Sequence, residues 1–100
     1  MDSLNKNWSN EDGTHEGGVS CGVGYCISWQ RGPLGDDGRN GAFLLEVLGS
    51  CRSQLAYFQD SKFKSQENED ALSHLDATIV ALESRRDRRS AEGTLGTTMI

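Results

Sequence analysis

The sequence predicts a mainly α-helical fold of the α+β class, in which a short β segment precedes an antiparallel α-helical hairpin. Apolar residues alternate with polar or small ones over residues 19–30, which is the period of a strand. In two later segments they recur every three or four residues, which is the period of a helix. Only 35% of the 100 residues are hydrophobic, so we expect the fold to be completed as a symmetric homo-oligomer.

Composition and charge exclude several classes of protein. The net charge of −5 disfavours binding along a nucleic-acid polymer. The longest apolar runs fall far short of the ~20 residues that a membrane helix needs, and the start of the chain has no apolar targeting segment. Three cysteines, Cys21, Cys26 and Cys51, are an odd number, which predicts reduced thiols rather than a disulfide framework. We expect no membrane contact.

The first 18 residues are polar, so we expect them to be flexible, with residues 19–100 forming a single domain. Over residues 19–30 the alternation places the larger side chains on one face of one half-buried strand. These side chains are Val19, Cys21, Val23, Tyr25, Ile27 and Trp29. A lone strand is not stable, so its partner is either a segment near the N-terminus or a strand of a neighbouring chain.

A helical hairpin is predicted over about residues 41–90, followed by a Gly/Thr-rich tail. Asn40 is placed to cap the first helix and Ser65 the second. The first helix carries the stripe Leu44, Leu48, Cys51, Leu55 and Phe58, and the second the stripe Leu72, Leu75, Ile79 and Leu82. Helices joined by a short loop pack antiparallel. Apolar residues outside the two stripes again indicate an oligomer.

Four arginines gather at the end of the second predicted helix. Arg85, Arg86, Arg88 and Arg89 precede Gly93 and Thr94. Guanidinium groups donate paired hydrogen bonds to phosphates, and a Gly-Thr pair adds backbone N–H groups and a hydroxyl. This pattern suits a small phosphate ligand. The alternative is that the arginines stabilise the helix macrodipole and have no ligand.

A second candidate site lies near the loop of the hairpin. Asn68 is a polar residue on the apolar stripe, and the aromatic residues Tyr57, Phe58 and Phe63 are close to it in sequence. An amide beside aromatic rings suits a nucleobase, which stacks and accepts hydrogen bonds. In the alternative interpretation Asn68 is a polar first-turn residue or bonds between the helices.

Catalysis is not expected. His74 and Asp70 share a helix face, but no motif ties a nucleophile to them, and phosphate-loop, dinucleotide and zinc-protease motifs are missing. Two histidines and no Cys-x-x-Cys do not indicate a structural zinc site. We therefore expect no metal and no cofactor.

The order and spacing of several motifs resemble a known family. They are Trp29-Gln30-Arg31-Gly32-Pro33-Leu34-Gly35, Asn40-Gly41-Ala42-Phe43, Tyr57-Phe58-Gln59, Ser61-Lys62-Phe63, Glu67-Asn68, Ala71-Leu72, His74-Leu75, Ala81-Leu82, Arg88-Arg89 and Glu92-Gly93-Thr94. Together, over about residues 25–94, they resemble the helical hairpin domain of phage anti-CBASS and anti-Thoeris sponges.

The resemblance implies a non-enzymatic inhibitor that acts in the host bacterial cytoplasm. Such sponges hold cyclic oligonucleotides or cyclic ADP-ribose isomers without cleaving them, in pockets between the protomers of an oligomer that is typically a hexamer. It implies that Arg88 and Thr94 grip phosphate, and that Phe58 and Asn68 line a cyclic ADP-ribose pocket. The family's Arg-Gly-Val-Glu-Gly-Thr motif reads here Arg-Ser-Ala-Glu-Gly-Thr, which lacks a glycine that would end the helix.

Two other functions remain open from the sequence. A protein-interaction module would inhibit a host protein by direct contact with its helical hairpin. An enzyme that degrades the messenger is disfavoured by the missing nucleophile and metal ligands.

Overall fold

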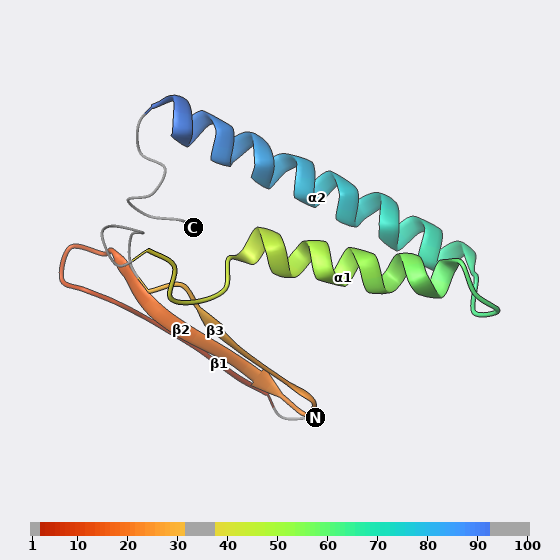
Figure 1. The fold of residues 1–100 in the computed structure, drawn as a ribbon, viewed down its shortest axis with the longest axis horizontal. Helices are drawn as coiled ribbons and strands as arrows, with labels where there is room; N and C mark the ends of the chain where they lie inside the picture. The colour runs from red at the N-terminus through yellow and green to blue at the C-terminus, as the bar shows by residue number, and fades with distance from the viewer. Residues whose placement is uncertain (1–2, 32–37, 93–100) are drawn as a thin grey trace. The chain divides into compact units, whose positions relative to one another are not determined.

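The computed structural model describes residues 3–31 and 38–92 and confirms an α+β fold, with three strands followed by two helices (Figure 1). The strands are β1 (Leu4–Ser9), β2 (His15–Gly22) and β3 (Tyr25–Trp29), and the helices are α1 (Leu44–Gln59) and α2 (Gln66–Ala91). The chain divides into two compact units. We call them the sheet unit, which holds the strands and runs to Leu44, and the hairpin unit, Leu45–Arg89.

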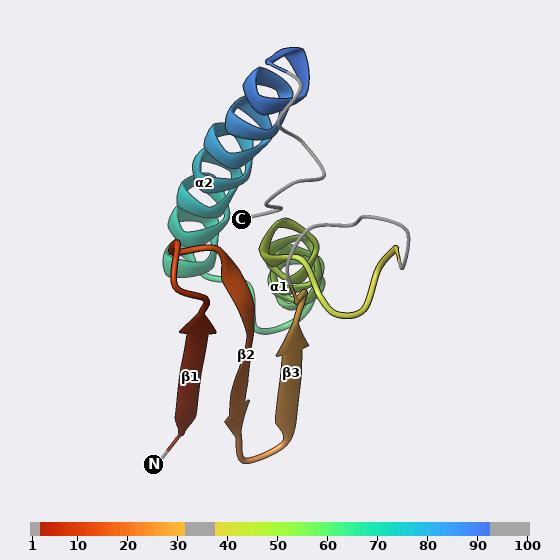
Figure 2. The ribbon, with the colours of Figure 1, turned by 90° about the vertical axis from the view of Figure 1, so that its left-hand side faces the viewer.

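The three strands form one antiparallel sheet in the order β1-β2-β3 (Figure 2). The polar range 1–18, expected to be flexible, contains β1 and the start of β2. Of the two partners considered for the predicted strand, the N-terminal segment is the one found, because β1 pairs with β2 from Leu4 to Ser9. Ladder hydrogen bonds to β2 order this polar segment without burying it.

The prediction of one strand over residues 19–30 was wrong, because the chain reverses at Val23 and Gly24. Gly24 has φ +89°, a conformation that glycine adopts without steric cost and that tight hairpin turns require. The reversal separates the alternating residues onto two faces. Val19 and Cys21 share one face with Cys26, whereas Tyr25 and Trp29 lie on the other.

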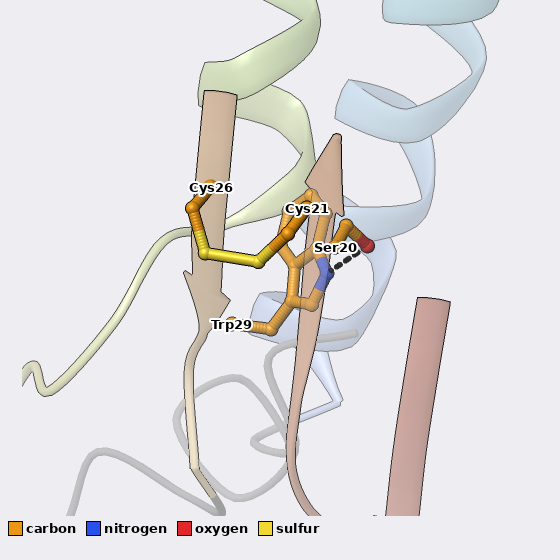
Figure 3. The surroundings of a disulfide bond; sticks show 4 residues. All are labelled: Ser20, Cys21, Cys26 and Trp29. Carbon is orange, nitrogen blue, oxygen red and sulfur yellow. Dashed lines mark hydrogen bonds between the residues drawn. A yellow bond between two sulfur atoms is a disulfide. The ribbon is translucent and has the colours of Figure 1, made fainter. Parts of the chain in front are cut away.

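The reversal also pairs Cys21 directly with Cys26, and the two form a disulfide (Figure 3). Reduced thiols had been expected for all three cysteines. The odd count allowed one bridge and one free thiol, and the free thiol is Cys51. On the opposite face of the sheet, the indole N–H of Trp29 donates to Ser20 Oγ at 2.8 Å, which links β3 to β2 (Figure 3).

Asn40 does not cap α1, which begins four residues later at Leu44. Its side-chain oxygen instead accepts the N–H of Arg31 at 2.6 Å, and its amide donates to the carbonyl of Arg31 at 3.1 Å. Gln30, 5% exposed, accepts the N–H groups of Asn40 (2.9 Å) and Gly41 (3.1 Å). These bonds hold the segment before α1 against the end of β3.

The helical hairpin is confirmed, and Ser65 caps its second helix by accepting the N–H of Asn68 at 3.0 Å. Arg52 on α1 forms an ion pair with Asp76 on α2, and Gln59 Nε2 donates to Glu69 at 3.1 Å. Both contacts have the same antiparallel register, which places Leu44 level with Ser84. Since α2 has 26 residues and α1 has 16, the last turns of α2 extend past the beginning of α1 (Figure 1).

The side of α1 that contacts α2 is not the predicted apolar stripe. It is rotated about the helix axis and includes Arg52 and Gln59. Half-buried residues Leu45, Leu48, Leu55 and Gln59 follow this line, whereas Leu44, Cys51 and Phe58 are exposed. The prediction counted apolar side chains only, and it missed that polar contacts to Asp76 and Glu69 occupy the facing line. On α2 the predicted stripe from Leu72 to Leu82 is half-buried.

Among the described residues, no hydrophobic side chain is fully buried. Neither described helix has the length and apolar character that a membrane span requires.

Candidate ligand-binding site

The arginine cluster lies in the last two turns of α2. Arg85, Arg88 and Arg89 lie within about 100° of one another around the helix axis and therefore project from one side of the helix. Arg85 and Arg89 are half-buried and Arg88 is exposed. Arg86 is three residues from Arg89 and borders the same side, and it donates from Nε and Nη2 to Asp87 Oδ1 at 3.3 and 3.2 Å. The four arginines therefore share one broad side of α2, and Arg86 is engaged by Asp87.

The register of the hairpin places this cluster beyond the first residue of α1. Leu44 is level with Ser84, so the turns from Arg85 onward have no α1 residue beside them. The side of α2 that is apolar from Leu72 to Leu82 therefore carries arginines in the turns beyond the beginning of α1. Predicted residues Gly93 and Thr94 lie outside the described residues.

The aromatic residues form a second group at the loop end of the hairpin. Tyr57 and Phe58 close α1 and are exposed, with their ring centroids 5.9 Å apart and the planes at 64°. In the loop, Lys62 Nζ lies 5.3 Å from the centroid of the Phe63 ring. This end of the hairpin therefore offers exposed π surfaces next to a cation.

Asn68 is held by the loop. Its Nδ2 donates to the carbonyl of Phe63 at 3.0 Å, in addition to the bond from its own N–H to Ser65. The amide is thus fixed in orientation against the backbone of Phe63. This arrangement satisfies the interpretation of Asn68 as a polar first-turn residue, and it leaves the predicted contact with a nucleobase untested.

The two predicted groups of site residues lie at opposite ends of the hairpin unit. Asn68 and Arg88 are 20 residues apart on one helix, which corresponds to about 30 Å along its axis. One small ligand does not reach both groups of a single chain. Among the described residues, the structure therefore separates the arginines of the phosphate group from Asn68 and the aromatic group.

Lys62 was missed by the sequence analysis. The signal was present, because Ser-Lys-Phe-Lys directly precedes the cap of α2, but a lysine next to an aromatic residue is common on surfaces. In the sheet unit Arg39 lies over the Phe43 ring, 4.0 Å from its centroid, and was also not singled out. Within residues 3–31 and 38–92, no three His, Cys, Asp or Glu side chains are grouped as metal ligands would be.

Comparison with known proteins supports the resemblance in its anti-Thoeris part. No protein-family model matches the sequence. In an alignment of 71 positions, which covers 68% of this chain and 50% of the relative, the sequence is 32% identical to Thoeris anti-defense 1 of Bacillus phage SBSphiJ7. This similarity supports a phage anti-Thoeris family for the chain. The chain spans about half the length of that relative.

Proposed function

We propose that this protein is a phage-encoded immune-evasion sponge, which binds cyclic nucleotide messengers of bacterial defence and holds them without cleaving them. The observation that carries the proposal is the similarity to Thoeris anti-defense 1. The messengers are cyclic ADP-ribose isomers, cyclic oligonucleotides, or both. The place of action is the cytoplasm of the host bacterium, where such messengers are made and read.

In this proposal the arginine cluster binds the phosphates. Arg85, Arg88 and Arg89 donate charge-assisted hydrogen bonds from one side of α2, and Gly93 and Thr94 orient the same group. Charge-assisted bonds contribute about 1.5–3 kcal/mol each, so three of them supply about 4.5–9 kcal/mol, and tight binding needs contacts to the base as well. Attraction to the phosphates weakens as salt screens the charges.

The aromatic end of the hairpin binds the base. Phe58 and Tyr57 supply exposed rings for stacking, and Asn68, whose amide is fixed by the carbonyl of Phe63, supplies a polar group at the same end of the hairpin. Stacking on an aromatic side chain contributes about 1–3 kcal/mol per base.

The separation of the two groups supports an assembly. A phosphate group about 30 Å from the aromatic group of the same chain completes a pocket only with residues from elsewhere. A homo-oligomer, with a hexamer favoured, supplies those residues from neighbouring copies, so that each pocket lies between protomers. The exposure of apolar residues in the described chain agrees with this assembly.

Calorimetric titration tests the proposal directly. The purified protein, with no host protein present, is titrated with cyclic di- and trinucleotides and with cyclic ADP-ribose isomers. Sub-micromolar binding, tighter than about −8 kcal/mol, with a simple ratio of sites to chains is the expected result. Recovery of the intact ligand after denaturation separates a sponge from a degrading enzyme. No binding across the panel would favour the protein-interaction module.

A matched pair of arginine variants tests the phosphate site. Arg88→Ala removes one guanidinium from the arginine cluster and should weaken binding of the retained messenger by about 1.5–3 kcal/mol. Arg86→Ala removes the same charge from the arginine that pairs with Asp87, and it should change affinity little. Equal effects of the two substitutions would show that only the net charge matters.

A further inference from the structure

In the sheet unit, Trp8 and Arg31 both lie against the backbone of Gly17. Trp8 is the partner of Gly17 in the ladder between β1 and β2. A Cβ built on Gly17 would stand 2.8 Å from Arg31 Cγ, and 3.4 Å from both Arg31 Cδ and Trp8 Cζ2. The stem of Arg31 therefore occupies the space of the side chain that Gly17 lacks, with the six-membered ring of Trp8 at its border.

The sheet is irregular at this point. Trp8 pairs with Gly17 and Ser9 with His15, so the ladder skips Glu16. Gly17 is buried and has φ +134°, a conformation that residues with a side chain rarely adopt. A bulge of this kind redirects the side chains beside it and is common next to active sites. Both the backbone conformation and the missing Cβ of Gly17 are therefore needed to seat Arg31 beside Trp8.

The backbone of Arg31 is fixed, while its side chain stays accessible. Asn40 accepts the N–H of Arg31 and donates to its carbonyl, and the preceding residue, Gln30, is 5% exposed. Arg31 itself is exposed, and Trp8 is 43% exposed. A cation and an aromatic ring are thus held next to each other on ordered backbone. Such preorganisation lowers the entropy that is lost when a ligand binds.

The charges and the ring suit a ligand that is both planar and anionic. Lys6, two residues before Trp8 on β1, shares its face of the sheet and is exposed. An indole ring stacks on planar groups, and a guanidinium donates paired hydrogen bonds to phosphate. The lysine adds a second positive charge. A nucleoside that carries a phosphate offers both a planar base and an anion within one small molecule.

We propose that Trp8, Arg31 and Lys6 form a binding site for a phosphorylated nucleoside. The base stacks on the indole of Trp8, the phosphate accepts hydrogen bonds from the guanidinium of Arg31, and Lys6 supplies the second positive charge. This site belongs to the sheet unit and shares no residue with the arginine cluster or the aromatic group of the hairpin. It goes beyond the proposed function, because it requires neither a cyclic messenger nor an oligomer.

Tryptophan fluorescence of the full chain, titrated with adenosine monophosphate, tests the site. The base should quench Trp8 with a saturable curve and a Kd below about 1 mM. Trp29 lies on the opposite face of the sheet, with its indole N–H bonded to Ser20 (Figure 3). Trp8→Phe should therefore abolish the quenching, while equilibrium dialysis still detects binding, because phenylalanine keeps a stacking ring. Trp8→Ala should lose the binding as well.

Substitutions of the arginine test the phosphate contact. Arg31→Ala should weaken binding of adenosine monophosphate by about tenfold or more. Arg31→Lys should give an intermediate loss, because lysine keeps the charge but not the paired donors. Lys64→Ala is the control, because it removes one positive charge from an exposed position of the hairpin unit. It should leave the Kd unchanged. Circular dichroism shows whether each variant is folded.

Two partial ligands test whether base and phosphate are both needed. Adenosine lacks the phosphate and inorganic phosphate lacks the base, so each should bind at least about tenfold more weakly than adenosine monophosphate. Adenosine that binds as tightly as its monophosphate would remove the role of Arg31. Inorganic phosphate that displaces the nucleotide at equal concentration would remove the role of Trp8.

The outcomes distinguish this site from the sponge. A protein that retains a cyclic messenger but shows no saturable quenching by adenosine monophosphate would keep the proposed function and overturn the inference. Quenching that Arg31→Ala weakens, in a protein that retains no cyclic messenger, would support the site and count against the sponge. Equal losses from Arg31→Ala and Lys64→Ala would mean that only net charge matters, which also overturns the inference.

Discussion

Arg52 on α1 and Asp76 on α2 form a two-point ion pair across the hairpin. The guanidinium Nε donates to Oδ1 of the carboxylate and Nη2 to Oδ2. With the bond from Gln59 to Glu69, this pair sets the register of the two helices. The register has a functional consequence, because it determines that Arg85 and the arginines after it extend past the beginning of α1.

The ion pair predicts a pH dependence of stability. The hydrogen bonds from Arg52 lower the pKa of Asp76 below its usual 3.8. A group whose pKa is lowered by folding stabilises the folded state above its usual pKa, and that contribution is lost as the pH falls toward the folded value. We expect Asp76→Asn to reduce the difference in urea midpoint between neutral pH and a pH well below 3.8. Both groups are exposed, so the effect is modest and decreases with salt.

The matched control for this titration is Asp60→Asn, at an exposed carboxylate just after α1. It should preserve the pH dependence of the wild type. If the two variants respond alike, the Arg52–Asp76 contact does not couple folding to protonation.

Gly41 is a position where a side chain does not fit. A Cβ there would lie 2.6–2.7 Å from backbone atoms of Trp29 and Gln30. Gly41→Ala should therefore destabilise the sheet unit by about 1–3 kcal/mol, as overpacking does. Tryptophan fluorescence during denaturation measures it, because Trp8 and Trp29 both belong to this unit.

At Gly49 a substitution by alanine should have the opposite effect on stability. A Cβ at this position of α1 meets nothing within 4 Å. Gly49→Ala should stabilise the hairpin by up to about 1 kcal/mol, because alanine costs less backbone entropy in a helix. The midpoint of the far-ultraviolet circular dichroism transition should rise. A loss of stability would indicate that the space beside Gly49 is filled in solution.

The disulfide predicts a defined thiol count. The unreduced denatured protein should react with one equivalent of a thiol reagent per chain, and the reduced denatured protein with three. Cys21→Ser with Cys26→Ser should lower the stability of the sheet unit by about 2 kcal/mol, because the bridge closes a loop of few residues. Cys51→Ser serves as the control. Three reactive thiols per chain in the unreduced denatured protein would show that the bridge does not form.

The cap of α2 is testable at one hydroxyl. Ser65→Ala removes the oxygen that accepts the N–H of Asn68 and should cost about 1 kcal/mol of hairpin stability. Ser73→Ala makes the same change at an exposed site inside α2 and should have little effect. Circular dichroism melting of the two variants measures the difference. Equal melting temperatures would argue against the cap.

The sequence alone determined the features that depend on local pattern. The three- and four-residue spacing over Leu72–Leu82 predicted α2, and Ser65 predicted its cap, because capping and amphipathicity act within one or two turns. The short loop predicted antiparallel helices. The arginine group and the aromatic group were both recognised from residue type and spacing, and the resemblance to anti-Thoeris sponges agrees with the similarity to Thoeris anti-defense 1.

Tertiary structure decided the features that depend on contacts between distant residues. Alternation over residues 19–30 has the same period whether the chain runs straight or reverses. The turn at Gly24 placed Cys21 and Trp29 on opposite faces of the sheet and paired Cys21 with Cys26. Asn40 has a capping side chain, but the backbone of Arg31 takes its hydrogen bonds. The line of α1 that meets α2 includes Leu45, Leu48 and Leu55, and only the contacts of Arg52 and Gln59 with α2 showed which apolar line of α1 faces its partner helix.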